Sequence, residues 1–315
     1  MERKKMGLTG WLLVIVIALA ISIFALWRAA LAFGNADTLN RIDALYSRDL
    51  PVGLAAAERY GETEAQRLEL YVPQTDADGP HKVIIFVHGG SWSFGAPEEY
   101  RFLARTFGDL GYATALAGYR LVPGGEFPAM LQDTAASVRW VVDNAAKFNL
   151  DAGNIYLMGH SAGAYNVLMT GLDRQWLQRE GLSGSAIKGV ISLAGPADFY
   201  PFDSDSTKAA FGQVDAPELT QPVTFARGDA PPLLLMHGLE DTTVYPKNSQ
   251  NLHRLVTQAG GTSYLEEYAG IDHAQIMMRL SRPFQENRAL INRVDQFIKD
   301  TSAARASAAV QAESP

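Results

Sequence analysis

Cysteine is absent from this chain of 315 residues, which excludes disulfide bonds, thiolate catalysis and zinc sites with cysteine ligands. Positive charge is scarce as well, because 27 Lys and Arg against 34 Asp and Glu give a formal net charge of −7. Since non-specific binding of nucleic acid needs a basic surface, we expect no nucleic-acid partner. With 47% hydrophobic residues, the chain can bury the core of one large α/β domain or of two small ones.

Charged residues are also missing from one long stretch near the N-terminus, between Lys5 and Arg28. Within it, Trp11–Trp27 is almost wholly apolar, and a helix of about 20 residues matches the hydrocarbon thickness of a bilayer. The two tryptophans stand where interfacial aromatic anchors are found. Because three basic residues precede the stretch, the positive-inside rule puts the N-terminus in the cytosol. We predict that residues 1–33 form a transmembrane membrane anchor, with the rest of the chain on the periplasmic or extracytoplasmic side.

Two alternatives to the anchor use the same apolar stretch. A secretory signal peptide shares the basic start, and Ala30-Leu31-Ala32 fits a cleavage site, so that the mature chain would be secreted. The apolar part of a signal peptide is normally about 7–15 residues long, however, which is shorter than this stretch. A buried core helix is disfavoured, because the stretch is apolar on all sides and lies at the extreme terminus.

Beyond residue 65, short apolar runs alternate with longer amphipathic ones. The short runs predict strands at residues 67–72, 82–87, 112–116, 154–158, 188–193, 232–236 and 262–268. The amphipathic runs predict helices at residues 97–110, 129–148, 161–172, 249–259 and 288–299. Strands that alternate with helices imply a mostly parallel central sheet with helices on both faces. Because ligands bind such sheets beyond the carboxyl ends of the strands, functional residues are expected there.

Three segments lie outside this alternation. Residues 34–65 are mixed and mildly helical, and we interpret them as a connector with lid helices. Residues 195–227 are rich in aromatics and turns, so they either complete a small lid over the ligand pocket or supply packing surface for the core. The tail, residues 301–315, lacks apolar bulk and is predicted to be disordered. Residues 66–300 then form a single folded domain.

The segment Gly159-His160-Ser161-Ala162-Gly163 fits the pattern G-x-S-x-G between a predicted strand and a predicted helix. A nucleophilic serine on such a turn has a strained backbone, and glycines on either side let the strand and the helix close without clash. The helix N-terminus also favours developing negative charge. The pattern alone is weak, and an ordinary glycine-flanked turn is the alternative. Its place between strand and helix favours Ser161 as a nucleophile.

A second glycine-rich loop, His88-Gly89-Gly90-Ser91-Trp92, follows a predicted buried strand. Acyl transfer passes through a tetrahedral oxyanion, which preorganised N–H donors stabilise by about 3 kcal/mol each. Backbone donors reach that oxygen where the loop lies flat against the substrate, which explains the paired glycines. We predict an oxyanion hole made by the N–H groups of Gly89, Gly90 and Ala162, with His88 bracing the loop. A glycine-rich turn without chemistry is the alternative.

A serine nucleophile needs a base within hydrogen-bond reach and a carboxylate that orients the base. Asp241 and His273 follow the last two predicted strands, and the order Ser161, Asp241, His273 is the chain order expected for this kind of sheet. We predict His273 as the base and Asp241 as a carboxylate that remains ionised. Glu240 and Asp272 are rival carboxylates. Asp272 is disfavoured because side chains of adjacent residues tend to diverge.

A metal site is the other interpretation of these residues. It would combine His237 with Asp241 and His273, but the three lack a recognisable ligand-spacing pattern. We therefore expect no metal and no cofactor.

Further segments extend the pattern beyond these motifs, namely Tyr119–Pro123 and Phe127–Ala129, followed by Asp133. With them, residues 68–297 resemble the α/β-hydrolase esterases related to hormone-sensitive lipase and the neighbouring carboxylesterase and kynurenine-formamidase groups. The resemblance implies an α/β-hydrolase fold. Hormone-sensitive-lipase-like enzymes usually have a third glycine where this chain has Ser91, so that its H-G-G-x-W loop is closer to that of formamidase-like members.

The motifs and the resemblance together predict a serine hydrolase that cleaves small-molecule carboxylic esters through an acyl-enzyme intermediate. Trp92 and Phe94 are candidates for lining the substrate pocket. An arylformamidase or another amidase with the same residues is the nearest alternative. A catalytically inactive, membrane-tethered binding module is a further one, but it predicts a missing residue, and Ser161, Asp241 and His273 are all present.

Overall fold

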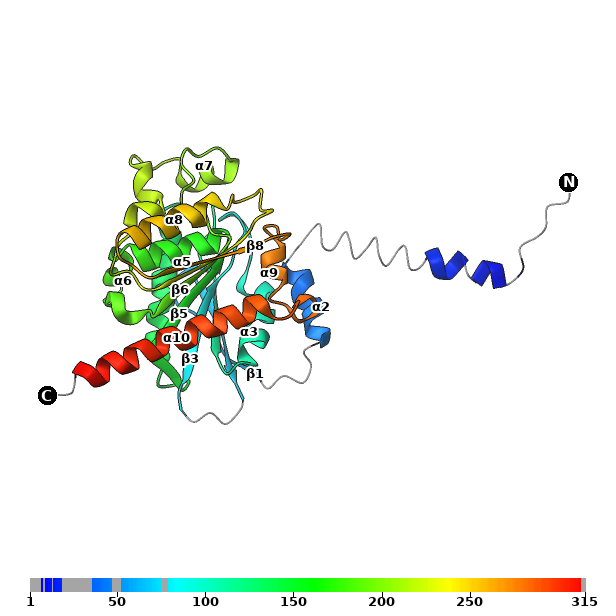
Figure 1. Ribbon diagram of the computed structural model, residues 1–315, viewed down its shortest axis with the longest axis horizontal. Helices are drawn as coiled ribbons and strands as arrows, with labels where there is room; N and C mark the ends of the chain where they lie inside the picture. The colour runs from blue at the N-terminus through cyan, green and yellow to red at the C-terminus, as the bar shows by residue number, and fades with distance from the viewer. Residues whose placement is uncertain are drawn as a thin grey trace.

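An eight-stranded sheet forms the centre of the computed structural model, which describes residues 7, 9–12, 14–18, 36–46, 52–74 and 79–312 (Figure 1). The strands are β1 (Val52–Arg59), β2 (Arg67–Pro73), β3 (His81–Val87), β4 (Ala113–Ala117), β5 (Leu150–His160), β6 (Gly189–Leu193), β7 (Leu233–Gly238) and β8 (Ser263–Tyr268). Their spatial order is β1-β2-β4-β3-β5-β6-β7-β8. β2 pairs antiparallel with β1 and with β4, whereas all the other pairings are parallel. The sheet is thus mostly parallel, with its antiparallel part at one edge.

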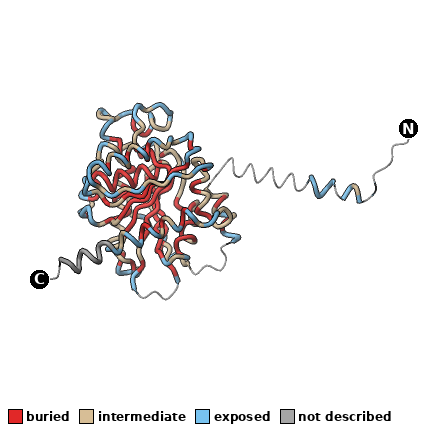
Figure 2. Tube along the Cα trace, in the orientation of Figure 1, coloured by how far each residue is buried: buried red, intermediate tan, exposed pale blue. Residues whose placement is uncertain are grey.

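Helices cover both faces of this sheet. They are α2 (Ala36–Tyr46), α3 (Arg101–Gly108), α4 (Ala129–Asn144), α5 (Ala162–Leu172), α6 (Gln175–Arg179), α7 (Asp205–Phe211), α8 (Lys247–Gln258), α9 (Gln275–Met278) and α10 (Ala289–Ala312). Successive side chains of a strand point to opposite faces. On β3, Val83, Ile85 and Val87 join the core under α4, α5 and α8. Ile84 and Phe86 join the core under α3 and α10. Figure 2 shows the buried strands between the two helical layers.

The predicted strands and helices between residues 66 and 300 are present, with shifts of a few residues at their ends. Two segments differ from the prediction. Residues 34–65 contain a helix, α2, but also the strand β1, which pairs with β2. The tail predicted to be disordered from residue 301 instead continues α10 as far as Ala312. β1 was missed because its alanine-rich sequence has low strand propensity, so that its pairing with β2 decides its structure.

Most of the predicted membrane anchor lies outside the described residues, which include only 11, 12 and 14–18 of the stretch Trp11–Trp27. Among the residues that are described, no helix is long and apolar enough to cross a bilayer. The anchor and its alternative, the signal peptide, both stay predictions.

A buried ion pair holds helix α2 against the domain. Asp43 is fully buried and accepts hydrogen bonds from Arg105 Nε on α3 and from the Arg282 backbone N–H, each at 2.7 Å. Arg105 also donates to the carbonyl oxygen and to the side chain of Asn40. Such partners are required because removing one side of a buried pair costs on the order of 3–5 kcal/mol. The network fixes α2 beside the carboxyl ends of the central strands.

The segment 195–227 combines the two roles predicted for it. It contains α7, which lies at the top of the molecule in Figure 1. Phe211 is fully buried and makes edge-to-face ring contacts with Trp92 and Tyr165, so it belongs to the core. Tyr200 is exposed and lines a pocket, so this part of the segment forms a rim above the sheet.

Candidate active site

The turn between β5 and α5 holds Ser161 in a backbone conformation that few residues other than glycine adopt. Its φ is 54° and its ψ is −121°, and such strain costs on the order of 1–3 kcal/mol unless the surroundings impose it. Here the surroundings are backbone atoms. A Cβ on Gly159 would lie 2.4 Å from the Gly163 carbonyl oxygen, and one on Gly163 would lie 2.1 Å from that of Val87. The Ser161 N–H donates to the Leu193 carbonyl on β6 at 2.9 Å. The turn is therefore locked between β3 and β6.

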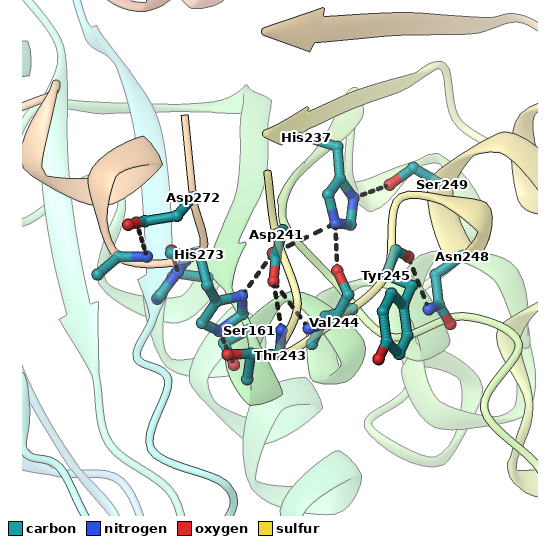
Figure 3. A network of polar contacts seen from close by, with 12 residues as sticks. Ser161, His237, Asp241, Thr243, Val244, Tyr245, Asn248, Ser249, Asp272 and His273 are labelled. Carbon is teal, nitrogen blue, oxygen red and sulfur yellow. Dashed lines mark hydrogen bonds and ion pairs between the residues drawn. The ribbon is translucent and has the colours of Figure 1, made fainter. Parts of the chain in front are cut away.

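Three side chains from separate loops form a continuous chain of hydrogen bonds (Figure 3). His273 Nε2 lies 2.9 Å from Ser161 Oγ, and His273 Nδ1 lies 2.7 Å from Asp241 Oδ2. An ionised carboxylate can only accept, so Nδ1 carries the proton and Nε2 accepts from the hydroxyl. The structure thus brings together the three residues that the sequence analysis singled out as nucleophile, base and orienting carboxylate.

Asp241 is buried, yet donors on several sides keep it ionised. Its Oδ1 accepts the backbone N–H groups of Thr243 and Val244 at 2.9 Å each. Its Oδ2 accepts from His273 and lies 3.4 Å from His237 Nε2. Burial by itself raises the pKa of this carboxyl, but the hydrogen bonds from His237, His273 and Val244 outweigh burial and hold the pKa of Asp241 well below its usual range. The carboxylate therefore keeps its charge throughout the neutral pH range.

The rival carboxylates lie elsewhere. Asp272 Oδ1 accepts the backbone N–H groups of Ala274 and Gln275 at 3.0 and 2.8 Å, which shapes the turn leading into α9. Glu240 is exposed to solvent. The carboxylate in contact with the imidazole of His273 is Asp241.

His237, which the sequence analysis considered only as a metal ligand, braces Asp241 instead. It is fully buried at the end of β7, and its Nε2 donates to the Val244 carbonyl oxygen at 2.7 Å. Its Nδ1 accepts from Ser249 Oγ on α8 at 2.7 Å. With both ring nitrogens engaged, the side chain has no lone pair for a metal ion. The signal in the sequence was a histidine that ends a buried strand four residues before Asp241.

Two further histidines border the site as neutral, buried groups. His160 Nε2 donates to the His273 carbonyl oxygen at 2.9 Å, and burial, reinforced by the proximity of the His273 ring, lowers the pKa of His160 to about 3. His88 Nδ1 donates to the Gly89 carbonyl oxygen at 2.7 Å, and burial lowers the pKa of His88 to about 4. Both rings thus brace backbone segments without adding positive charge beside His273.

The predicted oxyanion hole combines Gly89 and Gly90 of the loop after β3 with Ala162 of α5. Gly90 and Ser91 line the pocket beside the candidate nucleophile, and Ala162 begins α5, where the first N–H groups lack intrahelical partners. Gly89 is not among the residues that line this pocket. Burial raises the pKa of Tyr100, and the nearby Gly89 backbone opposes that rise. Because Ser91 lines the pocket next to Gly90, it is a further candidate donor beside the predicted ones.

Backbone geometry explains why the loop needs Gly89 and how it turns. A Cβ on Gly89 would lie 3.2 Å from Ser161 Cβ, so the glycine allows the loop to approach Ser161 closely. Ser91 and Trp92 both have positive φ, 51° and 59°. Trp92 anchors this turn, because it is 3% exposed and donates from Nε1 to Asn166 Oδ1 at 3.2 Å. Trp92, predicted to bind substrate, is thus almost wholly buried in this turn.

Two pockets meet at Ser161. The α2 pocket has a volume of about 290 Å³ and is lined, among others, by Leu39, Ile42, Phe94, Met277, Met278 and Phe284. The Tyr200 pocket has a volume of about 310 Å³ and is lined, among others, by Asp198, Tyr200, Ser206, Thr207, Tyr245 and Lys247. Ser91, Ser161 and Thr243 line both pockets. Of the two aromatic residues predicted to bind substrate, Phe94 lines the first pocket and Trp92 the second.

Comparison with known proteins gives matches over most of the domain. A family model described as BD-FAE matches residues 68–256, more than half of the chain. Isoprenylcysteine alpha-carbonyl methylesterase ICME of Arabidopsis thaliana is 27% identical over 241 residues, which cover 70% of this chain and 56% of that protein. Kynurenine formamidase of Danio rerio is 26% identical over 228 residues, which cover 70% and 75%. The chain thus spans little more than half the length of the methylesterases it matches.

A solved structure, esterase B from Lactobacillus rhamnosis, matches with a TM-score of 0.69 and 22% identity over 88% of this chain and 96% of that protein. The apo form of Thermogutta terrifontis esterase 2 matches with a TM-score of 0.66 and 21% identity over 78% and 94%. At these identities the likeness shows the fold alone. The predicted α/β-hydrolase fold and the predicted resemblance to this group of esterases and formamidases are confirmed.

The contacts of His237 predict its effect on the base. In His237→Phe, the Val244 carbonyl oxygen loses its donor, and Asp241 Oδ2 loses the neighbouring Nε2 at 3.4 Å. Asp241 then becomes a stronger acceptor for the imidazolium of His273, so the acid limb of kcat/KM against pH moves upward. We also expect kcat to fall roughly 10- to 100-fold, with KM nearly unchanged, because the base is held less accurately.

Steady-state kinetics from pH 4 to 9 measures both effects. His237→Gln, which keeps a donor, should recover most of the shift. His253→Phe on α8, which loses only a contact to Ser263 outside the site, is the matched control. An unmoved acid limb in the folded Phe variant would show that His237 is merely structural.

Proposed function

The chain belongs to the BD-FAE family, and from this premise we propose that it is a serine hydrolase that cleaves carboxylic esters with Ser161 as nucleophile. The observation that carries the proposal is the hydrogen-bond chain from Ser161 through His273 to Asp241, with links of 2.9 and 2.7 Å. Relatives named as methylesterase and esterase support the reaction class. The position of Ser161 at a helix N-terminus, where negative charge is favoured, supports it further.

In the first step, Ser161 Oγ attacks the ester carbonyl while His273 Nε2 takes the hydroxyl proton. The new C–O bond turns the carbonyl oxygen into an oxyanion. The N–H groups of Gly90, Ser91 and Ala162 hold this oxygen, and losing one such donor typically costs about 10²- to 10³-fold in kcat. The ionised Asp241 stabilises the imidazolium without taking its proton.

In the second step, the imidazolium of His273 protonates the leaving oxygen, the bond from carbon to that oxygen breaks, and an acyl-enzyme remains. Water then enters, gives its proton to the same imidazole and attacks the acyl carbon. Collapse of the second oxyanion returns the proton to Ser161 Oγ and frees the acid.

The proposal gives activity a definite dependence on pH. A base must be neutral to take a proton, so we expect activity to fall on the acid side. Asp241 does not set this limb, because its pKa lies well below the usual carboxyl range. His88 and His160 do not set it either, because burial lowers their pKa values to about 4 and about 3.

Ser161→Ala tests the nucleophile. We expect hydrolysis of phenyl acetate to fall by on the order of 10⁶-fold, because no other group can form the acyl-enzyme. A fluorophosphonate probe should label the parent protein at Ser161 and leave the variant unlabelled, with equal thermal unfolding as the control for folding. Absence of labelling in the parent protein would favour an inactive binding module.

A formamidase is the second candidate function, and a specific observation favours it. The match to kynurenine formamidase covers 75% of the length of that protein, whereas the match to the methylesterase ICME covers 56% of its length. An amide leaving group needs a proton more urgently than an alcohol does, and His273 Nε2 would supply it.

A substrate panel separates the two candidates. An esterase should cleave phenyl and alkyl acetates with a kcat/KM at least about 100-fold above that for N-formylkynurenine, because its site is not built to protonate an anilide nitrogen. The reverse ratio would make the protein a formamidase. Ser161→Ala is the control for both reactions.

We further propose that residues 1–33 anchor the protein in a membrane, with the domain on the periplasmic or extracytoplasmic side. The support is the charge-free stretch Trp11–Trp27 with basic residues before it. Secretion after cleavage of a signal peptide remains the alternative.

Fractionation of cells that express the full chain tests the anchor. The protein should stay in the membrane pellet after washing with alkaline carbonate, and external protease should digest the domain once the outer barrier is opened. Ile15→Lys with Ile17→Lys should abolish retention, because each charge costs about 3 kcal/mol at the centre of a bilayer. A mature N-terminus near Ala32 would instead identify a signal peptide, and recovery from the cytosol would contradict both.

A further inference from the structure

The two pockets that meet at Ser161 differ in chemistry. An ester carbonyl has an acyl arm on one side and an alcohol arm on the other, so a substrate bound at Ser161 can place one arm in each pocket. The volumes, about 290 and 310 Å³, are similar. The size of the pockets therefore does not show which arm each one binds. The polarity of their lining residues does.

The α2 pocket favours an apolar group. Among the described residues that line it, none is Asp, Glu, Lys or Arg. Leu39 and Ile42 of α2 line it together with Met277, Met278 and Phe284, and Asp43 fixes α2 in place through Arg105. A charged or strongly polar group would lose its hydration there without gaining partners. Each buried methylene, by contrast, raises affinity about fourfold.

The Tyr200 pocket offers hydrogen bonds instead. Asp198, Ser206, Thr207 and Lys247 line it, between the exposed rings of Tyr200 and Tyr245. These groups satisfy polar substituents of a ligand, which an apolar wall cannot do.

The wall of the Tyr200 pocket is preorganised. Asn248 is buried, and its Oδ1 accepts the backbone N–H groups of Ala197 and Asp198 at 3.0 and 2.8 Å. Its Nδ2 donates to the Tyr245 carbonyl oxygen at 2.9 Å (Figure 3). Asn251 holds the Asp198 carboxylate from the far side at 2.7 Å. The polar groups therefore need little ordering when a ligand binds.

The reaction geometry decides which arm enters which pocket. The leaving oxygen has to receive a proton from His273, and His273 lines the α2 pocket but not the Tyr200 pocket. Of the candidate oxyanion donors, Gly90 lines the α2 pocket, Ala162 lines the Tyr200 pocket and Ser91 lines both, so the position of the proton donor His273 makes the assignment. Resting on the esterase function proposed above, we propose that the substrate is an ester of an apolar alcohol with an acid that carries hydroxyl or other hydrogen-bonding groups.

Two isomeric esters test this assignment directly. Hexyl glycolate has the apolar chain on the alcohol and the hydroxyl on the acid, whereas 2-hydroxyethyl hexanoate exchanges them. After division by the rate of hydroxide-catalysed hydrolysis of each ester, kcat/KM should favour hexyl glycolate at least about tenfold, as pocket contacts of this kind do. Equal values, or a preference for the hexanoate, would overturn the proposal.

Variants assign each arm to its pocket. Ile42→Trp fills the α2 pocket and should lower the ratio of hexyl to methyl glycolate at least about tenfold, with the ratio of methyl glycolate to methyl acetate unchanged. Ser206→Leu should lower the second ratio and spare the first. Leu45→Trp, on the exposed side of the same helix α2, is the matched control. An unchanged hexyl ratio in Ile42→Trp would show that the alcohol does not occupy the α2 pocket.

Phenyl acetate and the fluorophosphonate probe separate a failure here from a failure of the esterase function. If phenyl acetate is cleaved and the probe labels Ser161 while the two isomers are cleaved alike, the esterase function is supported and the proposed substrate class is wrong. If neither acts, the proposed function itself is wrong, and the substrate class falls with it.

Discussion

Close contact between backbone segments at Ser161 is the constraint on which the rest of the site depends. The α5 end of the turn touches the last residue of β3 with no room for a side chain, since a Cβ on Gly163 would lie 2.1 Å from the Val87 carbonyl oxygen. On the other side, the Ser161 N–H is bonded to Leu193 on β6. The strained φ of Ser161 follows from these contacts. Because the oxyanion loop begins directly after Val87, the same contacts also fix its distance from the hydroxyl.

Because the Ser161 hydroxyl is fixed in this way, the base His273 has to be held beside it. Buried polar contacts hold it there. The loop that carries His273 is held by its ring contact to Asp241 and by the hydrogen bond from His160 to its carbonyl oxygen. His237 in turn holds the loop of Asp241 through Val244. Burial keeps His160 neutral at neutral pH, so the charge of Asp241 acts on His273 without a competing cation there. Positioning and electrostatics thus come from one network.

The parts of this arrangement that could be predicted from the sequence are those encoded in local patterns. Continuous apolar runs indicated the parallel strands, and the chain order of Ser161, Asp241 and His273 indicated the candidate site. The strand β1 was not predicted, because the conformation of an edge strand of small residues depends on its pairing with the neighbouring strand, here β2. The place of Ser91 beside Gly90 in the pocket depends on the φ angles of the loop. No local pattern carries that information.

The sheet positions the reacting groups, whereas the walls of the two pockets, which determine substrate specificity, come mainly from other segments. The reacting groups follow β3, β5, β7 and β8, whose spacing the parallel ladder sets. The pocket walls come mainly from segments outside that ladder: α2, fastened by the pair of Asp43 and Arg105, and the segment from 196 to 207, fastened by Asn248. A change in either wall can therefore alter what binds without moving Ser161. Because Asp43 accepts hydrogen bonds from both Arg105 and the Arg282 backbone, it determines where the apolar wall stands.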